Sequence, residues 1–168
     1  SGNIANVEKM DSMFKLAAAF NQSISDWVIT KVTTTAGMFE GAVTFNQDLD
    51  TDTGAGKWDV SKIKKMSTIF KDCEDFHQDL DNWDVSKVSD MSGMFEGCTI
   101  FNNNGISANW NVAEVTTMAN MFKGAKAFAQ DISSWDVVKV FDMSGMFMDT
   151  DSFNQPIGNW GVKTAEVT

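Results

Sequence analysis

One unit of sequence recurs along the chain and limits the folds that the chain can adopt. The stretch WDVSKVSDMSGMFEGCTIF, residues 83–101, returns about six times with a base period of 25 residues. Each unit carries one Trp and two Phe, at Trp27, Trp58, Trp83, Trp110, Trp135 and Trp160, at Phe14, Phe39, Phe70, Phe95, Phe122 and Phe147, and at Phe20, Phe45, Phe76, Phe101, Phe128 and Phe153. A fixed period of about 20–50 residues is typical of solenoids. We therefore predict a single solenoid repeat domain over residues 1–168, a fragment of a longer array because both ends fall inside a unit.

Apolar residues in one half of each unit have the spacing of a helix. In the fourth unit they are Val88, Met91, Met94, Phe95 and Cys98. Steps of three and four residues place such side chains on one face of a short helix. Ser89 stands where an N-cap would begin this helix, and Gly97 stands where a glycine would end it. The pattern therefore predicts a helix of about two turns in every unit.

The other half of the unit has the pattern of a short strand. Trp83 and Val85 are separated by one polar residue, which is the alternation of a half-buried strand. One short strand and one short helix every 25 residues resemble the plan of a leucine-rich repeat. The predicted fold is an α/β solenoid, a right-handed leucine-rich-repeat-like array of about six repeats with short parallel strands and short helices.

Three repeated positions have structural interpretations. The Trp of each unit either stacks in the core or forms an exposed row that binds sugar rings, and its alternation with Val85 favours the core. Cys73 and Cys98 share a position that holds Ala or Thr in other units, which favours buried, reduced thiols. Amide pairs such as Asn46-Gln47 are predicted to satisfy backbone groups at turns, with His77 as a substituted member of that row.

The charge balance excludes some classes of partner. The formal net charge is −10 and the pI is near 4.4, so nucleic acid is not an expected partner, because phosphate binding depends on basic residues. No apolar run approaches the roughly 18 residues that a membrane-spanning helix needs, so no membrane insertion of this chain is expected. Repetition also argues against an enzyme, since catalysis needs one distinctive group of residues. A recurring Asp84-to-Lys87 spacing is interpreted as a local contact at a turn.

The longest insertion contains a candidate calcium site. Asp48, Asp50 and Asp52 alternate along residues 48–57, and Asp59 follows them. Alternating carboxylates on a turning loop suit Ca²⁺, which takes 6–8 oxygen ligands. The glycine and the last acidic residue do not have EF-hand spacing, so a solvated acidic turn is the competing interpretation. No other cofactor is expected.

The repeat resembles that of BspA-like surface proteins, a leucine-rich-repeat type found in bacterial and mycoplasma surface lipoproteins. The segments FNQDLD, WDVSKI, MSTIF, WDVSKV, MSGMF and FNQPIGNW carry the resemblance, which covers almost the whole chain. It departs at Thr35, at Asn111 and at two insertions. The resemblance implies an extracellular, cell-surface, non-enzymatic solenoid used in attachment to host proteins or other cells.

The expected function is therefore a cell-surface adhesion or protein-interaction module whose partner is an extracellular protein or a cell-surface ligand. The alternative is a calcium-dependent carbohydrate-binding module that uses Asp48, Asp50 and Asp52 with exposed Trp. Strand edges left open at the two ends of the coil also make end-to-end self-association an expectation.

Overall fold

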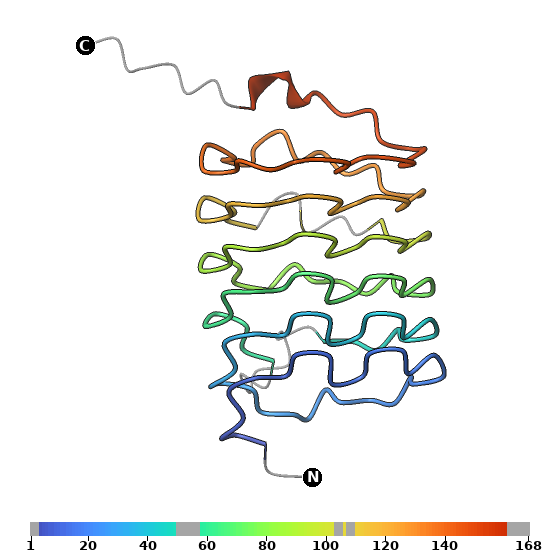
Figure 1. The fold of residues 1–168 in the computed structure, drawn as a ribbon, viewed down its shortest axis with the longest axis vertical. Coiled ribbons are helices and arrows are strands. Elements are labelled where there is room, and N and C mark those ends of the chain that lie inside the picture. The colour runs from blue at the N-terminus through green and yellow to red at the C-terminus, as the bar shows by residue number, and fades with distance from the viewer. Residues whose placement is uncertain (1–3, 50–57, 103–105, 107–109, 161–168) are drawn as a thin grey trace, which may run out of the picture.

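The chain forms a stack of coils that climbs from the N-terminus to the C-terminus (Figure 1). The computed structural model describes residues 4–49, 58–102, 106 and 110–160. Six turns of the stack, here numbered coils 1 to 6, begin at Val7, Val32, Ile63, Val88, Val115 and Val140. One short helix has defined bounds within the described ranges, the 3₁₀ helix η1 at Ile157–Asn159. The solenoid is therefore built almost entirely from turns.

The prediction of a helix in each unit is wrong, and consecutive β-turns explain the helix-like spacing. In coil 4 the N–H of Met94 donates to the carbonyl of Met91 at 3.2 Å, and that of Cys98 donates to Phe95 at 3.1 Å. The third residue of each turn has a positive φ, 60° at Gly93 and 75° at Gly97. Such bonds with a positive φ only at the third residue define a type II turn. The ends of these turns point inward three and four residues apart, as a helix face would.

Every coil has both positive-φ positions, whatever residue occupies them. The two rows are Ser12, Gly37, Thr68, Gly93, Asn120 and Gly145, and Leu16, Gly41, Asp72, Gly97, Gly124 and Asp149. Gly97 was expected to end a helix, and it has the left-handed backbone that this role requires, but it lies inside a turn instead. The coils thus keep the turn geometry even where Leu16 or Thr68 must adopt a backbone that L-residues disfavour.

The predicted strand at the Trp-x-Val pattern is also wrong. Within the described residues, β pairing is limited to isolated parallel bridges in another column, which we call the bridge column: Lys9, Thr34, Lys65, Asp90, Thr117 and Asp142. The turns on either side reverse the chain before a strand can extend. Because the described part of the coils contains isolated bridges and one three-residue 3₁₀ helix in place of strands and α-helices, the α/β, leucine-rich-repeat-like plan does not describe this fold.

Backbone bonds between coils replace a conventional sheet. From coil 4 to coil 5, the amides of Met91, Gly93, Phe95 and Gly97 donate to carbonyls of coil 5 at 2.8–3.1 Å. Ser89 was expected to cap a helix, but its hydroxyl donates to Lys64 O of the preceding coil at 3.2 Å. The turns leave these groups unpaired within a coil, so each coil depends on its neighbours.

Two columns of Phe rings fill the interior. Phe95 stacks on Phe101 of its own coil at 4.0 Å between ring centroids, and on Phe70 and Phe122 of the neighbouring coils at 5.8 and 5.7 Å. The interplanar angles of these pairs are 10–12°. One coil therefore continues the ring stack of the next.

The expected burial of Trp is confirmed in the interior coils. Trp58, Trp83, Trp110 and Trp135 are at most 5% exposed, whereas Trp27 and Trp160 in the outer coils are half-buried. The indole N–H of Trp83 donates to Leu49 O at 3.1 Å, and that of Trp110 donates to Leu80 O at 3.0 Å. Each buried indole thus satisfies its polar atom on the preceding coil.

We predict that Phe95→Ala lowers the free energy of unfolding by about 3–5 kcal/mol, because a fully buried ring is lost from a stack of three coils. Phe141→Ala is the matched control, since that ring is 81% exposed, and we expect little change. Urea unfolding of both variants measures the difference. Equal stability of the two variants would contradict the assigned core.

Candidate interaction surface

The two thiols belong to the core. Cys73 and Cys98 are free and fully buried, which confirms the sequence interpretation. Each thiol donates to a carbonyl of the preceding coil, Cys73 to Phe39 O at 3.1 Å and Cys98 to Phe70 O at 2.9 Å. Burial raises the pKa of Cys73 to about 12 and raises the pKa of Cys98 well above its ordinary value. Both groups are therefore neutral thiols in the folded chain, and neither has the properties of a nucleophile.

The amide ladder is also structural, as expected. The side-chain oxygen of Asn46 accepts the backbone N–H of His77 at 3.1 Å and the amide of Gln78 at 2.9 Å. Asn21 makes the equivalent bonds with Asn46 N–H and Gln47. His77 takes the place of an Asn in this row, with its Nε2 at 3.2 Å from the Asn46 amide nitrogen.

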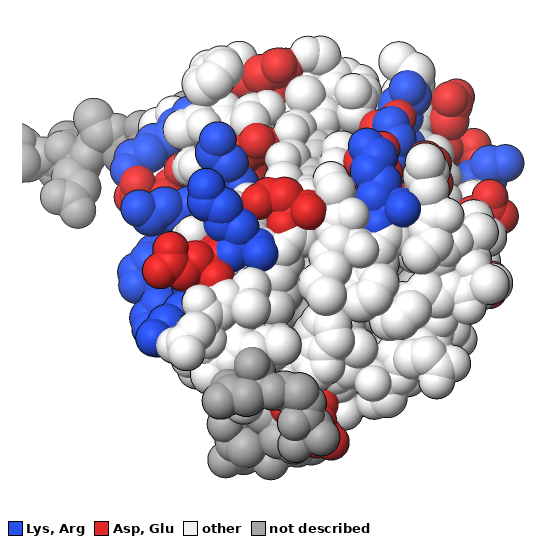
Figure 2. Space-filling model, turned by 60° about the horizontal axis from the view of Figure 1, so that its bottom comes forward, with Lys and Arg blue, Asp and Glu red and all other residues white. Residues whose placement is uncertain are grey.

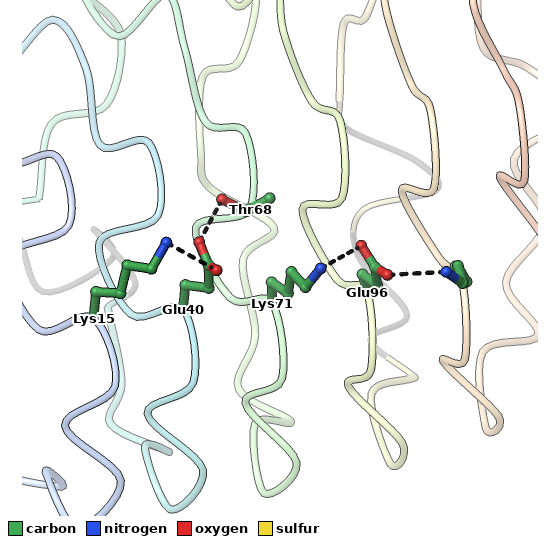
Figure 3. A network of polar contacts seen from close by, with 6 residues as sticks. Lys15, Glu40, Thr68, Lys71 and Glu96 are labelled. Atoms are coloured by element: carbon green, nitrogen blue, oxygen red, sulfur yellow. Dashed lines mark hydrogen bonds and ion pairs between the residues drawn. The ribbon is translucent and has the colours of Figure 1, made fainter.

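A column of alternating charge runs along the stack on another face (Figure 3). Lys15 pairs with Glu40 at 3.0 Å, and Glu96 pairs with Lys71 at 3.0 Å and Lys123 at 3.3 Å. The hydrogen bond with Glu96 raises the pKa of Lys71. Such partly exposed pairs each contribute about 0.2–1 kcal/mol. Because the ammonium and carboxylate groups satisfy one another, this column offers little free charge to a partner.

The Asp and Lys that recur three residues apart, such as Asp59 and Lys62, bond to other groups and not to each other. Asp59 accepts the N–H of Ser61 at 3.0 Å, closing its own turn. Lys62 donates to Thr30 O at 2.8 Å, and Lys139 pairs with Glu114 of the preceding coil at 2.6 Å. The spacing therefore reflects two separate roles, a turn closed by Asp and a lysine directed at the neighbouring coil.

Half of the calcium candidate lies outside the described residues. Asp50 and Asp52 are not among them, whereas Asp48 is exposed and Asp59 is half-buried. Among the residues that are described, no group of three His, Cys, Asp or Glu is arranged to hold a metal ion. The calcium site stays a prediction.

Three lysines that sequence reasoning did not single out lie around one depression of the surface. Its volume is about 560 Å³, and Lys9, Lys64 and Lys65 line it together with Asp11 and Asp90. Figure 2 shows lysine side chains gathered in bands, with acidic side chains beside them. Register could have revealed this cluster, since Lys9 and Lys65 share one position of the repeat and both bridge to Thr34.

Two exposed apolar side chains flank the start of coil 6. Phe141 is 81% exposed and Val138, three residues earlier, is 56% exposed. Equivalent positions in the other coils hold Glu, Thr, Lys and Ser, or Thr, Ser and Ala. This departure from the repeat was visible in the sequence but was not interpreted. No helix in the described part of the chain has the length and apolarity that crossing a bilayer would require.

The fold and these surfaces define a class of protein: a turn-built repeat solenoid with a uniform aromatic core and variable outer columns. The family model described as "Mycoplasma protein of unknown function, DUF285" matches residues 2–53, 51–108 and 75–168. The chain belongs to that family. No curated protein and no solved structure matches it.

The buried thiols predict a loss of stability at alkaline pH. The pKa of Cys73 rises from its ordinary value of 9.0 to about 12 on folding. The contribution of the neutral Cys73 thiol to stability is fully present below about pH 9. It is lost as the pH rises toward 12, because the thiol ionises in the unfolded chain before it ionises in the folded one. We expect Cys73→Ala/Cys98→Ala to flatten this decline, since Ala occupies the same position at Ala42 and Ala125.

Urea unfolding of both proteins at about pH 8 and about pH 10.5 measures the difference in slope. Lysine titration is common to the two proteins and cancels in the comparison. Parallel declines would contradict the role of the thiols.

Proposed function

We propose that this chain is a non-enzymatic protein-interaction module that serves adhesion at the cell surface. The observation that carries the proposal is the difference between uniform aromatic columns in the core and variable columns on the outside. The Phe95 column repeats one residue type in every coil, whereas the bridge column changes from Lys to Thr to Asp. A stiff stack that displays different side chains at regular intervals suits recognition of an extended surface.

The resemblance to BspA-like surface proteins supports an extracellular location and attachment to host proteins or other cells. The family match to a mycoplasma repeat protein is compatible with that reading. The carbohydrate-binding alternative needs an exposed Trp row, and the interior indoles Trp58, Trp83, Trp110 and Trp135 are buried. No observation therefore favours it over a protein partner.

We predict that the purified, fluorescently labelled chain binds intact host cells and that protease treatment of those cells removes the binding. Binding should persist in EDTA, because the proposal needs no calcium. Flow cytometry on treated and untreated cells measures both effects. Protease-resistant binding that EDTA abolishes would replace this proposal with the calcium-dependent carbohydrate module, and turnover on a hydrolase panel that survives further purification would overturn the non-enzymatic reading.

Self-association is part of the proposal. The amides of Met143, Gly145 and Phe147 in coil 6 donate to no acceptor among the described residues, whereas their equivalents in coil 4 bond to the next coil. In coil 1, the carbonyls of Lys9 and Asp11 accept no backbone hydrogen bond within the same part of the chain. These donors and acceptors have matching register, so one copy can continue the stack of another.

We expect the mean mass of the isolated chain to rise with protein concentration in sedimentation equilibrium. The rise should persist at high salt, because backbone hydrogen bonds and apolar stacking carry the contact rather than surface charge. A single monomeric mass across the accessible concentration range would contradict end-to-end association.

A further inference from the structure

One hydrogen-bonded column joins the lysine depression to the exposed apolar side chains at the start of coil 6. Its backbone amides donate in succession from Phe141 to Thr116, from Thr116 to Ser89, from Ser89 to Lys64 and from Lys64 to Thr33, at 2.9–3.0 Å. Lys64 and Phe141 therefore stand in one line, three coils apart. At about 4.8 Å per coil, this separation is about 14 Å.

The lysines at one end of this line are not paired. The ammonium groups of Lys9, Lys64 and Lys65 make no ion pair or hydrogen bond with the described residues, in contrast to Lys71 and Lys123. All three side chains are exposed. In a chain of net charge −10, an unpaired group of this kind is a local site of attraction for anions.

The carboxylate of Asp11 is held by the neighbouring coil and that of Asp90 by its own turn. Asp11 accepts the Thr34 hydroxyl at 2.5 Å and the Ala36 N–H at 3.2 Å. Asp90 accepts the N–H and hydroxyl of Ser92 at 3.0 and 2.6 Å. These contacts engage one oxygen of each carboxylate, and neither carboxylate forms an ion pair with the three lysines.

The other end of the line is apolar. Phe141 on coil 6 and Val138 at the end of coil 5 expose most of their surface. Exposed aromatic side chains rimmed by polar residues are typical anchors of protein interfaces. A charged end and an aromatic end on one straight column together favour a partner that carries both kinds of group.

We propose that this column, together with Lys9 and Lys65 of the adjacent bridge column, is a docking surface for an extended acidic segment of a partner protein, with carboxylates at the three lysines and an apolar side chain on Phe141. The proposal rests on the protein-interaction function and names its partner chemistry. At about 3.3 Å per residue, about four residues of extended chain span the two ends.

A uniformly charged polyanion fits this surface less well. Above Lys65, the bridge column continues as Asp90, Thr117 and Asp142. A sulfated polysaccharide lying along the axis would meet these carboxylates after leaving the lysines, and like charges at close range oppose binding. An acidic peptide that becomes apolar after a few residues avoids that repulsion.

The test uses a fluorescent synthetic peptide with three Glu, a four-residue Gly/Ser spacer and one Trp. Anisotropy titration at physiological salt is expected to show binding that falls roughly tenfold or more for Lys9→Gln/Lys64→Gln/Lys65→Gln, and similarly for Phe141→Ala. Peptides that lack the Trp or the spacer should also bind more weakly. Heparin serves as the polyanion probe.

Two controls match the variants in chemistry but lie outside the column. Lys126→Gln removes another exposed lysine without a partner among the described residues, and Met148→Ala removes another exposed apolar side chain, 52% exposed. Both should leave peptide affinity unchanged. All altered side chains are on the surface, so thermal unfolding should show that every variant retains the fold.

Peptide affinity that is equal in the column variants and the wild type, or no binding at all, would overturn the proposal. Heparin binding that needs the three lysines but not Phe141, and exceeds peptide binding, would reassign the surface to a polyanion. If protease-sensitive cell binding persists in the column variants, this docking surface fails while the interaction function stands. If cell binding is also absent in the wild type, both fail.

Discussion

The structure depends on the registration of one coil against the next. Two type II turns in each coil leave a row of amides and carbonyls that no group in the same coil can satisfy, and the neighbouring coil supplies their partners at 2.8–3.1 Å in the case of Met91, Gly93, Phe95 and Gly97. The same spacing brings Phe70, Phe95 and Phe122 into one ring stack. Because hydrogen bonding and ring stacking require the same register, a shift of one coil by a residue would lose both at once.

This dependence explains why the sequence predicts the core but not the secondary structure. Val88, Met91, Met94, Phe95 and Cys98 were identified as one buried set, and all are buried. Their spacing of three and four residues is shared by a helix face and by consecutive turns whose end residues point inward. Gly93 and Gly97 distinguish the two, since glycine at both third positions favours type II turns. Coils 5 and 3 have Asn120 and Thr68 at the position of Gly93, so the glycine pattern is missing there although φ is positive.

The candidate surface was less accessible to sequence reasoning because it lies across coils. Lys9 and Lys65 are far apart in the chain, and their proximity follows only from a register in which Thr34 bridges to both. Whether a lysine is paired is a matter of geometry as well. Lys71 and Lys65 look alike in the sequence, yet Lys71 contacts Glu96 at 3.0 Å, whereas Lys65 has no ion pair within the described residues. The shared repeat position of Lys9 and Lys65 and the departure at Phe141 are visible in the sequence, but the absence of an ion pair is not.

The Phe95 column is uniform and the bridge column is variable for a physical reason. A ring in the Phe95 column touches rings above and below at less than 6 Å, so a change of shape there disturbs three coils. Side chains in the bridge column are exposed or half-buried and lie outside the ring stack, so a replacement there leaves the Phe rings in place. The Phe95 column therefore keeps one residue type in every coil, whereas the bridge column changes from coil to coil. If the chain acts as the proposed interaction module, its outer columns are where one coil differs most from another on the surface, and Lys9, Lys65 and Phe141 lie there.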